Sequence, residues 1–267
     1  MKSLFRIRRI SAVTASVFSL AAYADVITVA PQGGDHTTLE AAVVAANDGD
    51  EIVIADGNYT RTDTGLFVIS KALVIRSANG CDAVSISGLG TGDRRGFYVS
   101  NALARVSGIT FRSFKSNVYT PGYATGLEIA YGSVSNCVIS NCTMNVGSAV
   151  KVTLEGILDD SLVCDNVSSW GGVDRKGAGV YISGGQVKNC EIRNNRSAVG
   201  AGIDINGATA RVSGCRIHGN SQNGQILTAS GKTLNGYGGG VHISAGLIEE
   251  CVIYNNTSFR GGGIHIE

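Results

Sequence analysis

One position of a repeated segment in this chain carries side chains that can bind ligands or exchange protons. The segment Ala201-Gly202-Ile203-Asp204-Ile205 shows the pattern of small residues, an apolar residue, a variable residue and a second apolar residue. Successive side chains of a strand point to opposite faces, so the variable residue faces away from its two apolar neighbours. In chain order the variable residues are Tyr98, Glu128, Lys151, Tyr181, Asp204, His242 and His265.

These variable residues suit an extended ligand. Aromatic and charged side chains in a row fit a polysaccharide chain, and the carboxylate and imidazole groups of Asp204, His242 and His265 are of the kind that bind divalent metals. An ordinary solvated strand face, which tolerates any outward residue, explains the same pattern. We take the seven residues as a candidate binding surface and predict no metal site, with Glu128 and Lys151 forming an ion pair of little energy.

A second outward set belongs to another strand of each repeat, in which an inward cysteine or small residue begins an alternating segment. Its members are Arg112, Ser140, Cys164, Arg193, His218 and Tyr254. They show the same mixture of charged and aromatic side chains. We expect them to form a second outward column.

Candidates for catalysis are few. A polysaccharide lyase needs a base near carboxylates that hold Ca²⁺, and a glycoside hydrolase needs two convergent carboxylates. Asp159-Asp160 precedes a strand and is typical of a turn, and Asp174-Arg175-Lys176 lies in an insertion and is typical of a solvated loop. His218-Gly219 is a third candidate. No catalytic residue is assigned, and Ca²⁺ is expected only if the protein is a lyase.

The elements that position these residues repeat with a period near 23 residues. The first apolar position of the segment advances by 23, 30, 23, 38 and 23 residues through Leu127, Val150, Val180, Ile203, Val241 and Ile264. Nothing between the copies is long or periodic enough for a repeated helix. Short strands and turns at this period predict a parallel β-helix, an all-β solenoid, and its crossovers should be right-handed.

Cysteine recurs at one inward position of this solenoid. Cys137, Cys190, Cys215 and Cys251 hold that position in successive copies, where Ile109 and Ser161 also occur. A column of small buried side chains explains the pattern without disulfides. Neighbouring strands lie about 4.8 Å apart, so a bridge between adjacent cysteines is also sterically conceivable. Both readings stay open, and the odd total of seven leaves at least one free thiol.

The variation in repeat length falls at a single corner. The insertions lie around residues 115–123, 167–176 and 221–237, always after the cysteine-containing strand and before the next glycine-rich strand. Loops gathered on one side of a solenoid commonly form a binding surface. Drift at a tolerant turn explains the clustering equally well.

The N-terminus predicts export. Lys2, Arg6, Arg8 and Arg9 precede an apolar stretch that ends at Ala22-Tyr23-Ala24, a signal-peptidase pattern. Loss of residues 1–24 removes four basic residues and no acidic ones, so the formal net charge falls from +1 to −3. The mature chain therefore has no charge signature for nucleic acid or membrane surfaces, and no further segment is apolar enough to span a membrane.

A short helix is expected at the start of the mature chain. Thr37-Thr38-Leu39-Glu40 predicts a capping box in which Thr37 opens the helix, with an apolar face made by Leu39, Ala42, Val43 and Ala46. Such a helix would cover the open end of the solenoid core. With Gly49-Asp50-Glu51-Ile52-Val53-Ile54 and Gly57-Asn58-Tyr59, this region resembles the N-terminal cap of pectin-lyase-like right-handed parallel β-helices.

The later repeats resemble exported bacterial β-helix proteins of the polymorphic outer-membrane type. An Ile-x-x-Asn element precedes Gly-Ile or Gly-Val, as in Ile192 to Asn195 before Gly202-Ile203. The resemblance covers residues 25–267 and implies fold and export. A polygalacturonase-like activity would also require that family's Asn-Thr-Asp and Gly-Asp-Asp elements, which this chain lacks.

The sequence thus predicts a signal peptide over 1–24, an N-terminal cap and first strands over 25–60, and β-helix coils over 61–267 that continue beyond Glu267. We expect an exported, non-catalytic stalk or passenger at the cell surface, adhesin-like, with a polysaccharide or surface protein as partner. The alternative is a lyase or hydrolase acting on acidic polysaccharide. No nucleic-acid partner and no cofactor are expected, and the sequence leaves the oligomeric state open.

Overall fold

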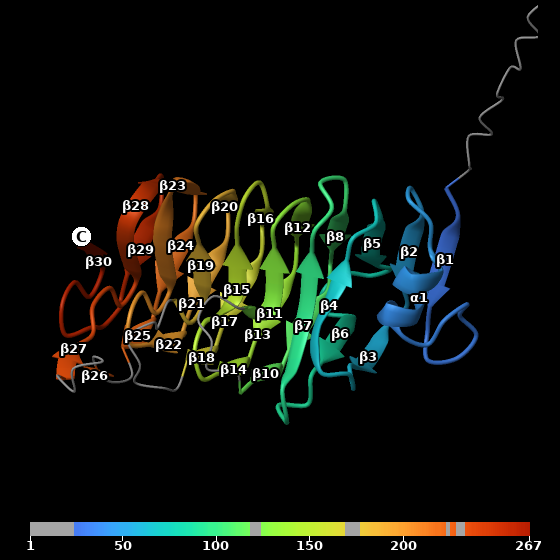
Figure 1. The fold of residues 1–267 in the computed structure, drawn as a ribbon, viewed down its shortest axis with the longest axis horizontal. Coiled ribbons are helices and arrows are strands. Elements are labelled where there is room, and N and C mark those ends of the chain that lie inside the picture. The colour runs from blue at the N-terminus through green and yellow to red at the C-terminus, as the bar shows by residue number, and fades with distance from the viewer. Residues whose placement is uncertain (1–23, 118–123, 169–176, 223–224, 228–232) are drawn as a thin grey trace, which may run out of the picture.

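The computed structural model describes residues 24–117, 124–168, 177–222, 225–227 and 233–267. Its strands wind into an elongated parallel solenoid with the N-terminal helix at one end (Figure 1). The turns from β7 to β25 contribute strands to four parallel ladders, and the earlier turns contribute to three of them, so that strands far apart in sequence lie side by side. The predicted all-β parallel β-helix with a short N-terminal helix is confirmed.

The first two ladders form adjoining faces of the solenoid. The β4 ladder consists of β4 (Gly65–Ile69), β7 (Arg94–Val99), β11 (Ala124–Ile129), β15 (Ser148–Val152), β19 (Val180–Ile182), β23 (Ile203–Ser213), β28 (Val241–Glu249) and β30 (Ile264–Ile266). The β1 ladder consists of β1 (Val26–Val29), β2 (Glu51–Ile54), β5 (Val74–Ser77), β8 (Arg105–Ser107), β12 (Ser133–Ser135), β16 (Ile157–Asp159) and β20 (Gln186–Lys188), and it continues into the second halves of β23 and β28.

The other two ladders complete each turn. The β3 sheet contains β3 (Gly57–Thr60), β6 (Val84–Ser87), β9 (Thr110–Arg112), β13 (Val138–Ser140), β17 (Leu162–Cys164), β21 (Glu191–Arg193), β24 (Arg216–His218) and β29 (Val252–Tyr254). The β10 ladder contains the short strands β10 (Lys115–Ser116), β14 (Thr143–Met144), β18 (Val167–Ser168), β22 (Arg196–Ser197) and β25 (Ser221–Gln222). An antiparallel hairpin, β26 (Gln225–Leu227) and β27 (Thr233–Asn235), lies outside these ladders.

The interior is apolar because each strand turns alternate residues inward. Phe97, Leu127, Val150 and Ile203 of the β4 ladder are fully buried, as are the central residues of the β3 sheet from Ile86 to Ile217. Together they belong to one continuous hydrophobic cluster. Burial of this kind supplies the main driving force for folding, roughly 25 cal/mol for each Å² of apolar surface removed from water.

A ladder of buried asparagines stabilises the corner between the β3 sheet and the β10 ladder. Asn195 Oδ1 accepts hydrogen bonds from the backbone N–H and side-chain amide of Asn166, at 3.1 and 2.9 Å. Asn195 in turn donates to Asn220 Oδ1, and Asn220 donates to Asn256 Oδ1. The backbone at this sharp turn thus finds its partners in the neighbouring coil.

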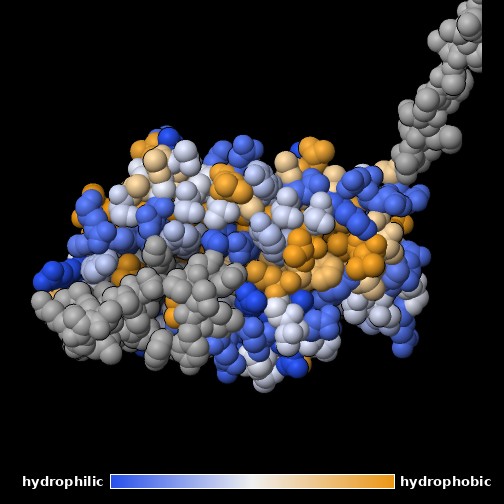
Figure 2. Space-filling model, viewed as in Figure 1, coloured by the Kyte–Doolittle hydropathy of each residue, from blue (hydrophilic) through white to orange (hydrophobic). Residues whose placement is uncertain are grey.

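The cap differs from the sequence prediction in its first residue. Helix α1 (Leu39–Ala45) is capped by Thr38, whose side chain accepts from the backbone N–H of Ala41, rather than by Thr37. Glu40 is therefore too early for a capping box, and its carboxylate lies 3.1 Å from the buried guanidinium of Arg61. The predicted apolar face is buried as expected. Figure 2 shows apolar side chains gathered over α1 and the adjacent strands.

The connections from the β10 ladder to the β4 ladder meet at one corner of the solenoid, which we call the loop-bearing corner. Their lengths range from three residues (145–147) and five residues (198–202) to eleven (169–179) and eighteen (223–240). Because the strands before and after them stack in register, the long connections share this corner. Parts of three connections at this corner, 118–123, 169–176 and 223–224 with 228–232, lie outside the described residues.

Candidate functional site

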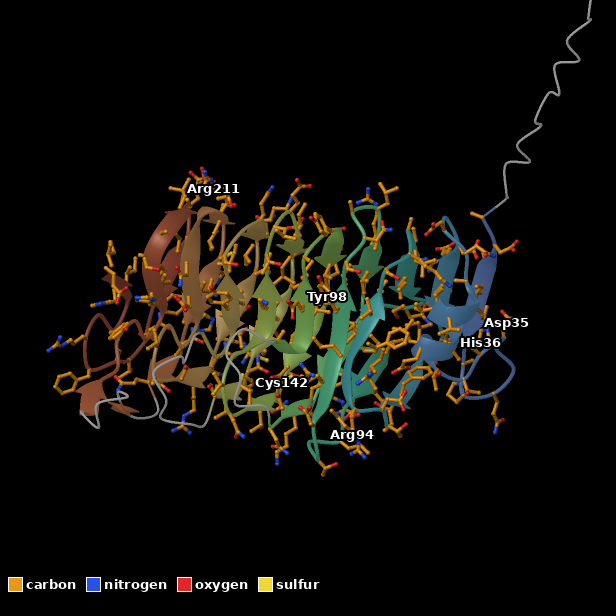
Figure 3. All side chains as sticks on the ribbon, viewed as in Figure 1. Asp35, His36, Arg94, Tyr98, Cys142 and Arg211 are labelled. Carbon is orange, nitrogen blue, oxygen red and sulfur yellow. The ribbon has the colours of Figure 1, made fainter. Side chains whose placement is uncertain are left out.

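The parallel register stacks the seven predicted surface residues in one column of the β4 ladder. Each residue pairs with the next across neighbouring strands, in the order Tyr98, Glu128, Lys151, Tyr181, Asp204, His242 and His265. Figure 3 labels Tyr98 on β7, at one end of this column. Whether the column binds a ligand stays a prediction.

The column is not the open solvated face that the sequence suggested. Asp204 and His242 are only 1% and 6% exposed, and the other five members are half-buried. At Asp204 and His242 the cause is the chain segment before β23 and before β28, which folds back over the ladder. Val199 pairs with Tyr237 in that segment, and Gly238, with φ at +66°, passes so close that an added Cβ would lie 2.9 Å from His242 Cβ. Alternation alone does not reveal this cover.

Asp204 and His242 form a buried acid–base pair. Asp204 Oδ1 lies 2.7 Å from His242 Nδ1, and this contact orients the imidazole ring. His242 Nε2 is buried without a hydrogen-bond partner in the described part of the chain, with Glu267 Oε1 3.6 Å away. A carboxylate that holds one imidazole nitrogen is the arrangement used to orient a general base.

Aromatic rings cover this pair. The ring centroid of Tyr237 lies 5.0 Å from that of His242 and 4.6 Å from that of His265, and the two histidine rings stack at 5.8 Å. Burial, reinforced by the charges of Glu267 and Asp204, raises the pKa of Tyr237. The phenol therefore stays protonated at neutral pH. Tyr237 is not among the residues predicted from the sequence, although its position before a glycine run matches that of Val199.

The geometry of the column does not favour metal binding. His242 Nδ1 faces Asp204, and the His242 and His265 rings lie nearly parallel at 18°. Within the described ranges, no three histidine, cysteine, aspartate or glutamate side chains are grouped to hold an ion. At the other end of the column, Lys151 Nζ lies 2.8 Å from Glu128 Oε1, and both side chains are mostly buried. This pair is less exposed than the surface pair expected.

The second predicted column is also in register, along the outer side of the β3 sheet. Arg112, Ser140, Cys164, Arg193, His218 and Tyr254 pair in that order. Ser140 and Cys164 are buried, so these two members of the outward column are not solvated as the sequence suggested.

Glu191, which the sequence analysis did not select, joins the charged members of the second column. Its carboxylate lies 3.3 Å from Arg193 Nε and 3.0 Å from His218 Nε2. The His218 ring stacks on Tyr254 with centroids 4.6 Å apart. Glu191 is identified only by its contacts with these neighbouring side chains in the structure. The residue type at its position varies from repeat to repeat, so the sequence pattern does not single it out.

The candidates for lyase or hydrolase chemistry do not assemble among the described residues. Asp159 accepts a hydrogen bond from the Asn189 amide at 3.0 Å and lies 3.4 Å from Lys188 Nζ. Asp160 is exposed and has φ at +43°, which fits the predicted turn role. His218 is held by Glu191 and Tyr254, and Asp174-Arg175-Lys176 lies outside the described residues.

The cysteine column is buried as predicted, except at its last member. Cys137, Cys190 and Cys215 are buried, Cys251 in the final coil is half-exposed, and all seven cysteines are free. The backbone N–H of Cys215 donates to Cys251 Sγ at 3.3 Å. Desolvation raises the pKa of Cys137 to about 12, which keeps this thiol protonated and unreactive.

This architecture of stacked parallel strands, with a helix at the N-terminal end and loops at one corner, defines a β-helix protein. The family profile described as "right handed beta helix region" matches residues 32–236, and the chain belongs to that family. The match supports the right-handed crossovers expected from the sequence. A comparison with curated proteins found no match.

Two solved structures are similar to the chain at low identity. The chain is 14% identical to pectate lyase Pel9A, with a TM-score of 0.49, and the match covers 83% of this chain and 70% of that one. It is 13% identical to a pectin methylesterase variant in complex with a hexasaccharide, with a TM-score of 0.33 and coverage of 89% and 72%. No helix in the described ranges is both long and apolar enough to cross a membrane.

Proposed function

We propose that this chain is an exported, non-catalytic β-helix stalk or passenger, displayed at the cell surface, whose loop-bearing corner contacts a partner. The observation that carries the proposal is that the strands bounding connections of three to eighteen residues stack in register, so that these connections begin and end at one corner. A rigid scaffold with variable loops on one side is a common design for recognition. The partner is a polysaccharide or a surface protein.

The charges beside this corner support binding over catalysis. Glu128 forms an ion pair with Lys151, and Asp204 Oδ1 contacts His242 Nδ1, so both carboxylates of the column already have partners within the protein. A lyase that acts on a uronate needs carboxylates free to hold Ca²⁺. Export is supported by the basic and apolar N-terminal sequence and its Ala22-Tyr23-Ala24 site.

The proposal is tested by removing the longest loop without disturbing the coils. Deletion of residues 223–235 leaves five residues, 236–240, between β25 and β28, the same number that joins β22 to β23. Residues 25–267 and this variant are compared on an immobilised panel of acidic and neutral polysaccharides and bacterial envelope proteins. Deletion of the exposed residues 208–209, at another corner, serves as the control.

We expect the unmodified chain and the control to bind a common component of the panel and the loop variant to lose it, with similar unfolding midpoints for all three. Equal binding by the loop variant to every component that the unmodified chain binds would contradict the proposal. So would the absence of binding to every component.

One observation favours the alternative, an enzyme acting on acidic polysaccharide. The buried Asp204–His242 pair has an imidazole nitrogen without a hydrogen-bond partner in the described residues, as a general base requires. The two functions are distinguished by product formation. An enzyme converts the polysaccharide to product, and a purely binding protein does not.

A further inference from the structure

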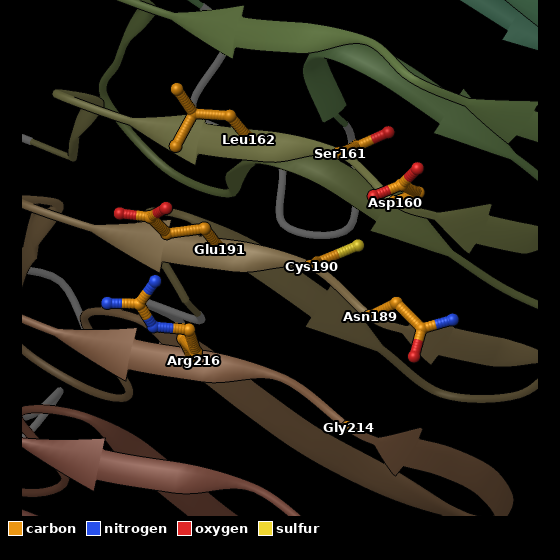
Figure 4. Close-up of a pocket in the computed structure, with 8 residues that line it drawn as sticks. All are labelled: Asp160, Ser161, Leu162, Asn189, Cys190, Glu191, Gly214 and Arg216. Carbon is orange, nitrogen blue, oxygen red and sulfur yellow. The ribbon is translucent and has the colours of Figure 1, made fainter.

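Two depressions on the outer side of the β3 sheet, away from the loop-bearing corner, have similar linings. The first measures about 330 Å³, and Figure 4 shows its lining on β17, β21 and β24. Glu191 and Arg216 lie at one end on neighbouring strands, and Asp160 and Asn189 lie at the other. Leu162 pairs with Glu191 across the neighbouring strand and adds an apolar surface at the first end.

The second depression, of about 240 Å³, lies on β3, β6 and β9 and repeats this chemistry. Arg112 again supplies a guanidinium, Asp82 a carboxylate from the turn before the strand, and Asn58 an amide. Cys81, Ser85 and Thr110 line the remainder.

The two depressions follow the same track along the solenoid. Asn58, Ser85 and Thr110 occupy one outer position of the β3 sheet, and Leu162, Glu191 and Arg216 occupy the same position farther along. The centres lie near β6 and β21, four strand spacings apart in the sheet order. At about 4.8 Å for each spacing, this is roughly 19 Å.

Each arginine is anchored on one side and exposed on the other. Arg112 donates to Asn58 Oδ1 at 3.1 Å, and Arg216 donates to the Tyr254 hydroxyl at 3.2 Å. Both side chains are exposed, and a guanidinium has five N–H groups, so further donors face the solvent. Exposed carboxylates of Asp82 and Asp160 lie in the same depressions as acceptors.

We propose that this face of the β3 sheet binds a linear, neutral polysaccharide that lies along the solenoid axis and enters both depressions. Sugar hydroxyls both donate and accept, so they match a lining that offers guanidinium and amide donors together with carboxylate acceptors. An acidic polymer would bring its own carboxylates against Asp82, Asp160 and Glu191, which disfavours it.

The spacing of the depressions predicts a dependence on ligand length. A trisaccharide fills one depression, whereas a hexasaccharide reaches the other and gains the second contact at high effective concentration. Calorimetric titration uses neutral gluco-, xylo- and manno-oligosaccharides of both lengths, with oligogalacturonates of equal length for comparison. The variants are Arg112→Ala, Arg216→Ala and the double substitution. Arg211→Ala, at an exposed site on a different edge of the molecule, is the control (Figure 3).

We expect at least one neutral hexasaccharide to bind about tenfold more tightly than its trisaccharide, and each single substitution to remove about that advantage. The double variant should bind most weakly, and Arg211→Ala should bind as the unmodified chain does. The proposal is overturned if no neutral hexasaccharide binds, if length has no effect, if the control loses affinity equally, or if oligogalacturonate binds more tightly. Deletion of residues 223–235 should leave oligosaccharide binding to the β3 sheet unchanged. This result would distinguish that binding from the partner binding proposed for the loop-bearing corner.

Discussion

The surroundings of Cys215 determine which side chain its interior position can hold. Cys215 is fully buried, and its thiol donates weakly to the carbonyl oxygens of Ser213 and Val187. Interaction with Cys190 is the largest contribution that raises its pKa to about 12. The side chain is thus a small, neutral, buried group.

We therefore expect Cys215→Asp to lower the free energy of unfolding by at least about 3 kcal/mol, because it buries a carboxyl group without a matched partner. Cys215→Ala should cost about 1–2 kcal/mol, since it leaves only a small cavity. Urea unfolding of the two variants measures both values. Equal effects of the two substitutions would show that this position is not a tightly packed interior site.

The raised pKa values also predict the reactivity of the thiols. At pH 8 the buried thiols of Cys137, Cys142 and Cys215 should be almost entirely protonated, because each has a pKa of about 12. A thiol reagent should modify them only after denaturation. Rapid modification of all seven cysteines in the native protein would contradict the buried column, and fewer than seven reactive thiols after denaturation would reveal a disulfide.

At the level of elements, the positions and register of the strands could be predicted from the sequence. The burial of their outward residues by the connecting segments could not. The alternation around Asp204 and His242 places both on the outward column, and the register confirms that placement. Their burial depends on Tyr237 and on the glycine turn before β28, which are contacts of a connection rather than of a strand. The helix position was predicted to within one residue because Thr37 and Thr38 are both good caps.

The asparagine ladder is the element on which the sharp corner depends. Asn195 is fully buried and exchanges hydrogen bonds with Asn166 and Asn220. We expect Asn195→Ala to lower the free energy of unfolding by about 2–4 kcal/mol, since it leaves buried backbone and side-chain groups unpaired on two coils. The exposed Asn117→Ala, measured by the same thermal or urea unfolding, should change stability by less than about 0.5 kcal/mol. Similar losses for the two variants would rule out a special role for the ladder.

At the scale of the whole molecule, the backbone N–H of Asp25, the residue after the predicted cleavage site, has a defined partner. The backbone N–H groups of Asn47 and Asp25 donate to the carboxylate of Asp50, at 2.7 and 2.9 Å, and these contacts lower its pKa. If export removes residues 1–24, the amide of Asp25 becomes an ammonium group beside this carboxylate. The contact then becomes an ion pair.

Two results follow from this contact. The exported protein should have an intact mass that begins at Asp25, and acetylation of that terminus should lower its stability by about 1 kcal/mol. A group with a lowered folded pKa stabilises the fold above its unfolded pKa, so the contribution of Asp50 is lost as the pH falls below about 3.8. Asp50→Asn should therefore be less stable than the unmodified chain at pH 6, with the difference shrinking toward pH 3. A difference that is constant over this range would contradict the assignment.

The central claim, that the molecule binds through a rigid scaffold without chemical turnover, is tested most directly by an assay for products. Purified residues 25–267 are incubated with polygalacturonate, with and without Ca²⁺, and unsaturated and reducing ends are measured against a heat-unfolded sample. The account predicts no increase in either kind of end. Product formation by the folded protein, abolished by His242→Gln in a variant of unchanged stability, would contradict the account and assign the Asp204–His242 pair to catalysis.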